Sequence, residues 1–283
     1  MQRRVVAVFS GGGAKSVAHV GAARALGEAG LAPSLYIGTS FGAVIAAALA
    51  SGTTPETLTD QLLHPTSRPV VSLDYVSLVK GFFADHLLKP QPLVQLIQRL
   101  VPVRRFEDLR VPLVVTATDL DSGELTLFGD GGQGRDAVGL HEVLYASCAL
   151  PLYYPAATID GRRFADGGLR AVLPLEPAKS IPADLVVAVH VGPGFDEGPP
   201  PTSANLHSLI PPPPVRAHGS SERIMMAAQT ERTIQDWPKD GATLVIVRPV
   251  RERETTFAVN NVKRYIEAGY EATKQSLVGQ TGA

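Results

Sequence analysis

Three short motifs in this chain carry residue types that could act on an ester. They are SGGGAK at Ser10–Lys15, GTSFG at Gly38–Gly42 and DGG at Asp166–Gly168. A serine hydroxyl can attack a carbonyl carbon when a base takes its proton, and a carboxylate can serve as that base. Backbone N–H groups can stabilise the charge that develops on the carbonyl oxygen. Together the three motifs supply a nucleophile, a base and a set of N–H donors.

Each motif is weak evidence when taken alone. With 27 Gly and 16 Ser in 283 residues, chance gives roughly 0.15 G-x-S-x-G strings in a chain of this composition. Glycines after a strand also permit a tight turn, and Asp-Gly-Gly is usually a turn. The evidence for chemistry must therefore come from the elements that surround the motifs.

The first two motifs each stand between a predicted strand and a predicted helix. An apolar strand at 4–9 precedes the glycines, and a helix at 14–29 follows, with small residues spaced to let one face lie close to a sheet. A strand at 35–37 and a helix at 43–50 flank Ser40, where Gly38 and Gly42 leave room for a sharp elbow. Both turns are expected at the carboxyl edge of the sheet. This predicts Ser40 as nucleophile, with the N–H groups of Gly11, Gly12 and Gly13 as an oxyanion hole in the same crevice.

The base is expected to be a carboxylate. The chain has seven histidines, of which His190 is predicted as a satisfied core residue and the others as loop, insertion, solvated or capping residues. A hairpin at 157–164, turning at Asp160-Gly161, is expected to deliver Asp166 onto a glycine loop with Gly167 and Gly168. Asp166 is therefore the predicted base, acting on Ser40 directly.

The rest of the chain predicts one α/β domain over 1–283 with three layers, a mostly parallel central sheet and helices on both faces. We expect a helical insertion or cap at 53–110 and a mobile proline-rich loop at 192–219. Further strands are expected at 113–118, 124–128, 185–191 and 243–247, and further helices near 138–148, 221–237 and 259–278.

Composition excludes several classes of protein. A net charge of −1 argues against nucleic acid as a partner, and a single cysteine excludes an intrachain disulfide and a cysteine-built zinc site. The longest apolar stretch, 41–50, is far shorter than the roughly 20 residues that span a bilayer. The short apolar run before the glycines argues against a secretion signal. We expect a cytoplasmic protein without metal or cofactor. Transient contact with a membrane surface, through apolar loops at 73–88 or 192–219, and the oligomeric state are left open.

The order and spacing of the motifs resemble those of the patatin-like phospholipase family. The likeness includes ASCALP at 146–151, the stretch from Tyr154 to FADGG at 164–168, and the final helix with IEAGY at 266–270, so it spans nearly the whole chain. The resemblance implies a patatin-like α/β/α fold and a Ser40–Asp166 dyad with Gly11–Gly13 as oxyanion hole. It further implies a lipid or acyl-ester substrate and no cofactor. Lys15 stands where many relatives have Arg, which puts a bidentate role at that position in doubt.

Two other functions compete with a lipid hydrolase. The GGGAKS string favours a nucleotide-binding loop, but such a loop would need glycine at the positions of Phe9 and Ala14, and the dinucleotide fingerprint would need glycine at Ser16. The other alternative is a lipid-binding scaffold without activity. The sequence leaves the acyl donor open among phospholipids, lysophospholipids, glycerides and soluble esters.

Overall fold

The computed structural model describes residues 3–64, 86–132, 138–196, 198, 213–251 and 261–278, with the backbone alone for 213–215. At its centre is an eight-stranded sheet. The strands are β1 (Val5–Phe9), β2 (Leu35–Thr39), β3 (Leu113–Asp119), β4 (Leu125–Gly129), β5 (Ala157–Ile159), β6 (Arg162–Asp166), β7 (Leu185–Val189) and β8 (Thr243–Val247).

The sheet is mostly parallel, as the sequence predicts. Strands β3, β2, β1, β7 and β8 lie in that order and run in the same direction. The β5–β6 hairpin pairs antiparallel with the last residues of β3, on the edge that β2 occupies at the preceding positions, and β4 pairs antiparallel with the other edge. The predicted turn of this hairpin is present, because Asp160 and Gly161 both have positive φ, at 49° and 77°.

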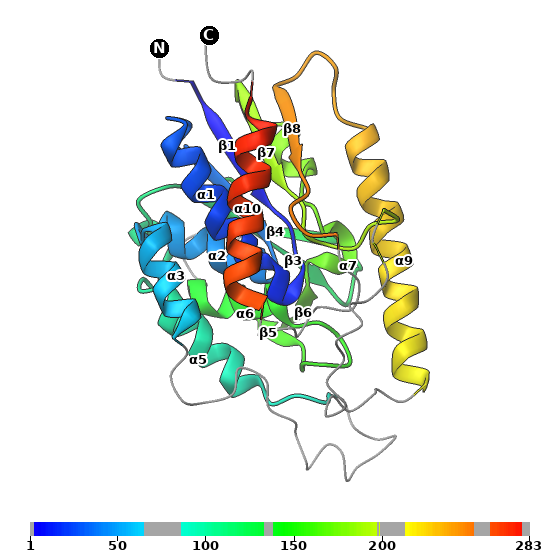
Figure 1. Ribbon diagram of the computed structural model, residues 1–283. Helices are drawn as coiled ribbons and strands as arrows, with labels where there is room; N and C mark the ends of the chain where they lie inside the picture. The colour runs from blue at the N-terminus through cyan, green and yellow to red at the C-terminus, as the bar shows by residue number, and fades with distance from the viewer. Residues whose placement is uncertain are drawn as a thin grey trace.

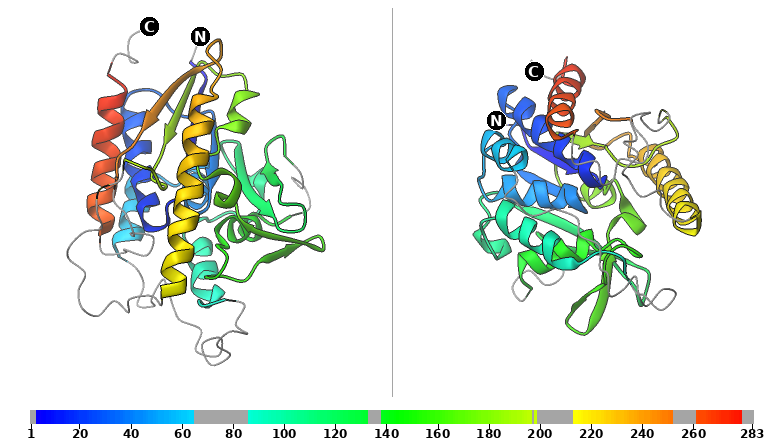
Figure 2. Two further views of the ribbon diagram at one scale, coloured as in Figure 1. Left: turned by 90° about the vertical axis from the view of Figure 1, so that its right-hand side faces the viewer. Right: turned by 60° about the horizontal axis from the view of Figure 1, so that its bottom comes forward.

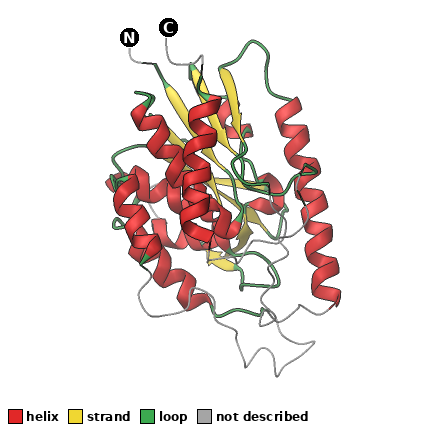
Figure 3. Cartoon of the chain, in the orientation of Figure 1, coloured by secondary structure: helices red, strands yellow, loops and turns green. Residues whose placement is uncertain are grey.

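Helices cover both faces of the sheet, which gives the predicted three layers (Figures 1, 2 and 3). Along β1, Val5, Ala7 and Phe9 enter the larger apolar core, and Val6 and Val8 enter the smaller one on the opposite face. The larger core includes side chains from α1 (Ala18–Glu28), α2 (Phe41–Ala50), α3 (Pro55–Leu63), α5 (Pro90–Leu100), α6 (Leu140–Cys148) and α10 (Val262–Ser276). The smaller core receives side chains from α8 (Glu176–Lys179) and α9 (Pro213–Gln235).

The insertion predicted at 53–110 contains helices α3 and α5 and the short 3-10 turn Phe106–Asp108. Residues 65–85, which carry most of the predicted apolar loop at 73–88, lie outside the described residues. Among the described residues, no helix is both long enough and apolar enough to cross a bilayer.

Three local predictions differ from the structure. The helix expected from residue 14 begins with a 3-10 turn, η1 (Gly13–Val17), before α1. The small residues of α1 lie against α10 rather than the sheet. The two helices are so close that a Cβ on Gly21 would collide with the carbonyl of Ile266. Helix α9 begins at Pro213, so residues 213–219 are helical and not part of the predicted loop. Proline is tolerated in a first helical turn, which explains that error. Most of 192–212 lies outside the described residues.

Candidate active site

The candidate site lies where β2 and β6 end on the same edge of β3. Thr39, the last residue of β2, pairs with Thr116, and Asp166, the last residue of β6, pairs with the next β3 residue, Ala117. At these positions β4 occupies the other edge of β3. Because β2 is parallel and β6 antiparallel to β3, the two strands run toward each other and finish at adjacent positions. Ser40 follows Thr39 directly, so the topology brings Ser40 to Asp166.

The Ser40 hydroxyl donates a hydrogen bond to Asp166, with 2.7 Å between Oγ and Oδ2. Ser40 is the N-cap of α2 and has φ 56° and ψ −137°, a conformation that residues other than glycine rarely adopt. Its glycine neighbours make this turn possible. A Cβ on Gly38 would lie 2.5 Å from Cα of Ala43, and one on Gly42 would collide with the carbonyl of Ser10. The turn therefore has the sharp form that the sequence predicts.

Asp166 is nearly enclosed by protein, with an exposed fraction of 5%. Its Oδ1 accepts a hydrogen bond of 2.7 Å from the N–H of Gly168, and Gly167 is the N-cap of the short helix α7 (Gly168–Ala171). The prediction that Asp166 lies on a loop was wrong, because it is the last residue of β6. Burial raises the pKa of Asp166 to about 7; the hydrogen bonds from Ser40 and Gly168 oppose this rise, and the charge of Glu222 adds to it. A carboxyl with such a pKa is suited to proton transfer near neutral pH.

The glycine run lies against Ser40. A Cβ on Gly11 would be 3.2 Å from Cβ of Ser40. The N–H of Gly11 donates to the carbonyl of Val172 at 2.9 Å, so it is not available to an oxyanion. This corrects the prediction that all three glycines donate. Among the described residues, no backbone carbonyl accepts a hydrogen bond from the N–H of Gly12 or Gly13. The N–H groups of Gly12 and Gly13 therefore remain as the candidate donors of the predicted oxyanion hole.

His19 does not contact the dyad. Its ring stacks on Phe9 with 4.5 Å between centroids, and Nε2 lies 2.9 Å from the carbonyl oxygen of Ser10. Full burial lowers the pKa of His19 to about 4, although the Ser10 carbonyl opposes the shift. The ring is thus a neutral core residue, not the solvated or capping residue that the sequence suggests.

His190 is also buried and neutral. Burial, followed by the charges of Arg248 and Lys15, lowers its pKa well below the usual value, and the Pro193 carbonyl acts in the opposite direction. His190 is thus a core residue, as the sequence predicts, with the Pro193 carbonyl beside its ring. Lys15 itself lies in η1 and is buried, with 5% of its surface exposed. Within the described part of the chain, no histidine is hydrogen-bonded to Ser40 or Asp166.

Sequence reasoning missed three residues around the dyad. The hydroxyl oxygen of Ser147 accepts a hydrogen bond of 2.8 Å from the N–H of Ser40. Cys148 lies beside both dyad residues: burial raises the pKa of its thiol, the charge of Asp166 adds to the rise, and a hydrogen bond with Ser40 opposes it. Glu222 of α9 acts on Asp166 from another element. Ser147 and Cys148 stand in the ASCALP stretch of the family likeness, which by itself assigns them no role, and Glu222 stands in no motif. Their contacts with Ser40 and Asp166 come from the packing of α6 and α9.

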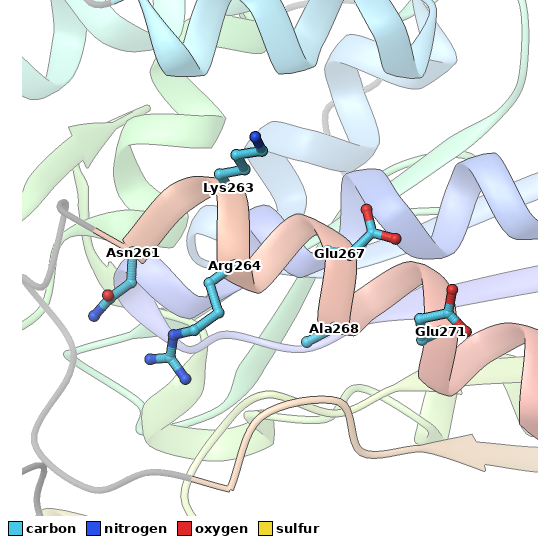
Figure 4. A pocket seen from close by; sticks show the side chains of 6 residues that line it. All are labelled: Asn261, Lys263, Arg264, Glu267, Ala268 and Glu271. Carbon is cyan, nitrogen blue, oxygen red and sulfur yellow. The ribbon is translucent and has the colours of Figure 1, made fainter.

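An open hollow on the surface of α10 has no part in this site. It is lined by charged, polar and small side chains on that helix or at its N-cap (Figure 4): Asn261, Lys263, Arg264, Glu267, Ala268 and Glu271. A surface formed by one helix offers no enclosed apolar space for an acyl chain.

Comparison with known proteins agrees with the motif order and the topology. The family model described as patatin-like phospholipase matches residues 7–179. The chain is 30% identical to an uncharacterized NTE family protein of Mycobacterium tuberculosis, over 73% of this chain and 56% of that protein. It is also 30% identical to human patatin-like phospholipase domain-containing protein 6, over 66% of this chain and 13% of that protein.

The chain thus spans about half the length of the mycobacterial relative and a small part of the human one. Among solved structures, it is similar to VipD from Legionella pneumophila, with a TM-score of 0.52 and 14% identity, over 99% of this chain and 67% of that one. That likeness concerns the fold alone. The family model covers more than half of the sequence and includes Ser40, Asp166 and the strands β2, β3 and β6 that position them, and on this basis the chain belongs to the patatin-like phospholipase family.

Proposed function

We propose that this protein is a serine acyl-ester hydrolase that cleaves lipid or lipid-like esters through a Ser40–Asp166 dyad. The observation that carries the proposal is the direct 2.7 Å hydrogen bond between the serine hydroxyl and a buried carboxylate. Membership in the patatin-like phospholipase family supports lipids as the substrate class.

The first half of the reaction acylates the enzyme. Asp166 takes the proton of the Ser40 hydroxyl while Oγ forms a bond to the ester carbonyl carbon. The N–H groups of Gly12 and Gly13 hold the resulting oxyanion. When this intermediate collapses, the bond from carbon to the alcohol oxygen breaks, and Asp166 returns its proton to the departing alcohol. The acyl group remains on Ser40.

The second half releases the acid. A water molecule gives a proton to Asp166 as its oxygen attacks the acyl carbon, and the same two N–H groups hold the second oxyanion. The bond between carbon and the Ser40 Oγ then breaks, Oγ recovers the proton from Asp166, and the carboxylic acid leaves. In this cycle one carboxyl alternates between base and acid, as its pKa of about 7 allows.

Labelling with a fluorophosphonate tests the proposal. The reagent reacts with a serine that is activated by a base and an oxyanion hole, so we expect one adduct, which peptide mass spectrometry should place on Ser40. Ser40→Ala should abolish labelling and ester hydrolysis without loss of secondary structure. A matched control is Ser51→Ala, which removes a buried hydroxyl at the other end of α2 and should label normally. Labelling of another serine in folded protein, or of none, would refute the proposal.

A further inference from the structure

A second carboxylate, Glu222 of α9, acts electrostatically on Asp166 from a different element. Helix α9 packs against α7, the helix that follows Asp166 (Figures 1 and 2). On α9, Glu222, Ala227 and Thr230 are buried, and Met226, one turn after Glu222, reaches to 3.7 Å from where a Cβ on Gly168 would stand. The face that carries Glu222 therefore covers the segment whose N–H binds Asp166.

Glu222 is unusual for a glutamate on a surface helix. Its side chain is 11% exposed, and its ion-pair partner is His218, at 3.3 Å between Nε2 and Oε1. A buried carboxylate lowers stability unless strong partners compensate for lost solvation. The His218 side chain is 46% exposed, so its ion pair offsets only part of the solvation that Glu222 loses on burial. Burial accordingly raises the pKa of Glu222, and His218 opposes that rise.

The groups that face these two carboxylates come from several elements. Asp166 interacts with Ser40 of the elbow, with Glu222, and with Cys148 of α6. Burial raises the pKa of Tyr153, which follows α6, and the charge of Glu222 adds to that rise. The charged residue of α7, Arg170, is exposed. Within the described part of the chain, the negative charge of Glu222 is thus the one carboxylate of another element that acts on Asp166.

We propose that Glu222, held by His218, is a positioning residue that acts through Asp166: from the helix face that covers Gly168, its negative charge favours transfer of the Ser40 proton to Asp166. This rests on the proposed function, because it takes Asp166 as the base. Like charges disfavour each other's ionised form, and a more basic carboxylate transfers the serine proton more readily. Glu222 and burial thus act on Asp166 in the same direction, and the buried Glu222 side chain itself lowers the stability of the fold.

The test is the pH dependence of fluorophosphonate labelling, measured as a rate for each variant. In Glu222→Gln, the acid limb should move to lower pH and the plateau rate at high pH should fall, because Asp166 loses a repelling neighbour. In His218→Gln, Glu222 loses the partner that favours its charged form, so the acid limb should move in the same direction as in Glu222→Gln, by a smaller amount. The double variant should behave as Glu222→Gln does, since His218 acts through Glu222. Glu231→Gln, an exposed glutamate on the same helix, is the matched control and should leave the profile unchanged.

The outcomes separate this proposal from the dyad itself. If Asp166→Asn labels and hydrolyses normally, the dyad is wrong. If Asp166→Asn is inactive but folded Glu222→Gln and His218→Gln keep the wild-type profile, or if Glu231→Gln shifts it as much, the role of Glu222 is refuted. His218 is exposed enough for its variant to fold even if Glu222→Gln does not, and the downward shift expected of that variant is then sufficient to decide.

Discussion

Ser40 and Asp166 are 126 positions apart in the chain, yet their side chains lie within hydrogen-bond distance. They meet because two strands of opposite direction end at neighbouring positions, Thr116 and Ala117, on the same edge of β3. Both partners are thus fixed by backbone pairing rather than by mobile loops. A site that is held by strand ends is ordered before the substrate arrives, which limits the reorganisation that the reaction requires.

The first prediction concerns Asp166 as the base. Asp166→Asn keeps the shape of the side chain and removes its basicity, so we expect kcat for ester hydrolysis to fall by about 10²- to 10⁴-fold with little change in KM. Steady-state kinetics on a short soluble ester measure this effect. Asp60→Asn, an exposed aspartate on α3, is the control. Retention of wild-type kcat in Asp166→Asn would exclude Asp166 as the base.

The second prediction follows from the raised pKa of Asp166 and concerns stability. The carboxyl has a reference pKa of 3.8 and one of about 7 in the fold, so the fold favours its protonated form. This contribution is complete below pH about 4 and is lost as the pH rises through about 7. Asn cannot ionise. Asp166→Asn should therefore match wild type at pH about 4 and exceed it at pH about 8.5, by up to about 4 kcal/mol.

Urea unfolding of both proteins at the two pH values measures the difference in free energy of unfolding. Asp60→Asn, at an exposed position on α3, again serves as the control for the substitution itself. An equal stability difference at both pH values would mean that the pKa of Asp166 is not raised.

The strands and the sharp turn at Ser40 could be predicted because they depend on local sequence. A run of apolar residues at both odd and even positions predicts a strand that is buried on both faces, as in β1. Glycines that flank a serine between a strand and a helix predict a sharp turn such as that at Ser40. The Asp160-Gly161 turn was predictable for the same reason, since its positive φ angles suit these two residues.

Contacts between distant elements could not be predicted in this way. The sequence around Glu222 does not indicate that α9 brings it near Asp166, and the ASCALP stretch at 146–151 does not by itself show that the Ser147 hydroxyl binds the N–H of Ser40. The use of the Gly11 N–H by Val172 depends on a segment 161 positions away. The start of α9 at Pro213 was missed because proline in a first turn and proline in a loop have the same local signature.

The third prediction concerns Ser147, which supports the elbow. Its hydroxyl accepts the N–H of Ser40 at 2.8 Å inside the protein. Ser147→Ala leaves that N–H without its partner, which should cost about 1–3 kcal/mol of stability and let the strained turn at Ser40 relax. We expect kcat to fall more than KM rises. Ser51→Ala, which removes a hydrogen bond to Ala48 within α2, should lower stability alone. Equal kcat in both variants would show that Ser147 is not needed at the elbow.

The fourth prediction concerns the predicted oxyanion hole. A Cβ on Gly12 would lie 2.8 Å from both Cγ2 and the carbonyl oxygen of Val191, so Gly12→Ala must displace the glycine loop. Loss of one oxyanion donor typically lowers kcat by about 10²- to 10³-fold. Gly27→Ala on α1, where a Cβ meets nothing within 4 Å, is the control and should be neutral or slightly stabilising. A fully active Gly12→Ala enzyme would place the oxyanion hole elsewhere.

The last prediction distinguishes a dyad from a Ser-His-Asp triad. With a pKa of about 7, Asp166 alone gives the pH–rate profile an acid limb that resembles the titration of a histidine. The profile by itself therefore cannot identify the base, and variants must do so.

His19→Phe keeps the stacking on Phe9 and removes the contact with the Ser10 carbonyl. His190→Gln replaces a ring that is neutral in the fold. Both should retain the acid limb and most of kcat when the rate is expressed per site labelled by fluorophosphonate, which corrects for any unfolded fraction. If either variant lost as much kcat per labelled site as Asp166→Asn, a histidine would be the base and Asp166 its partner.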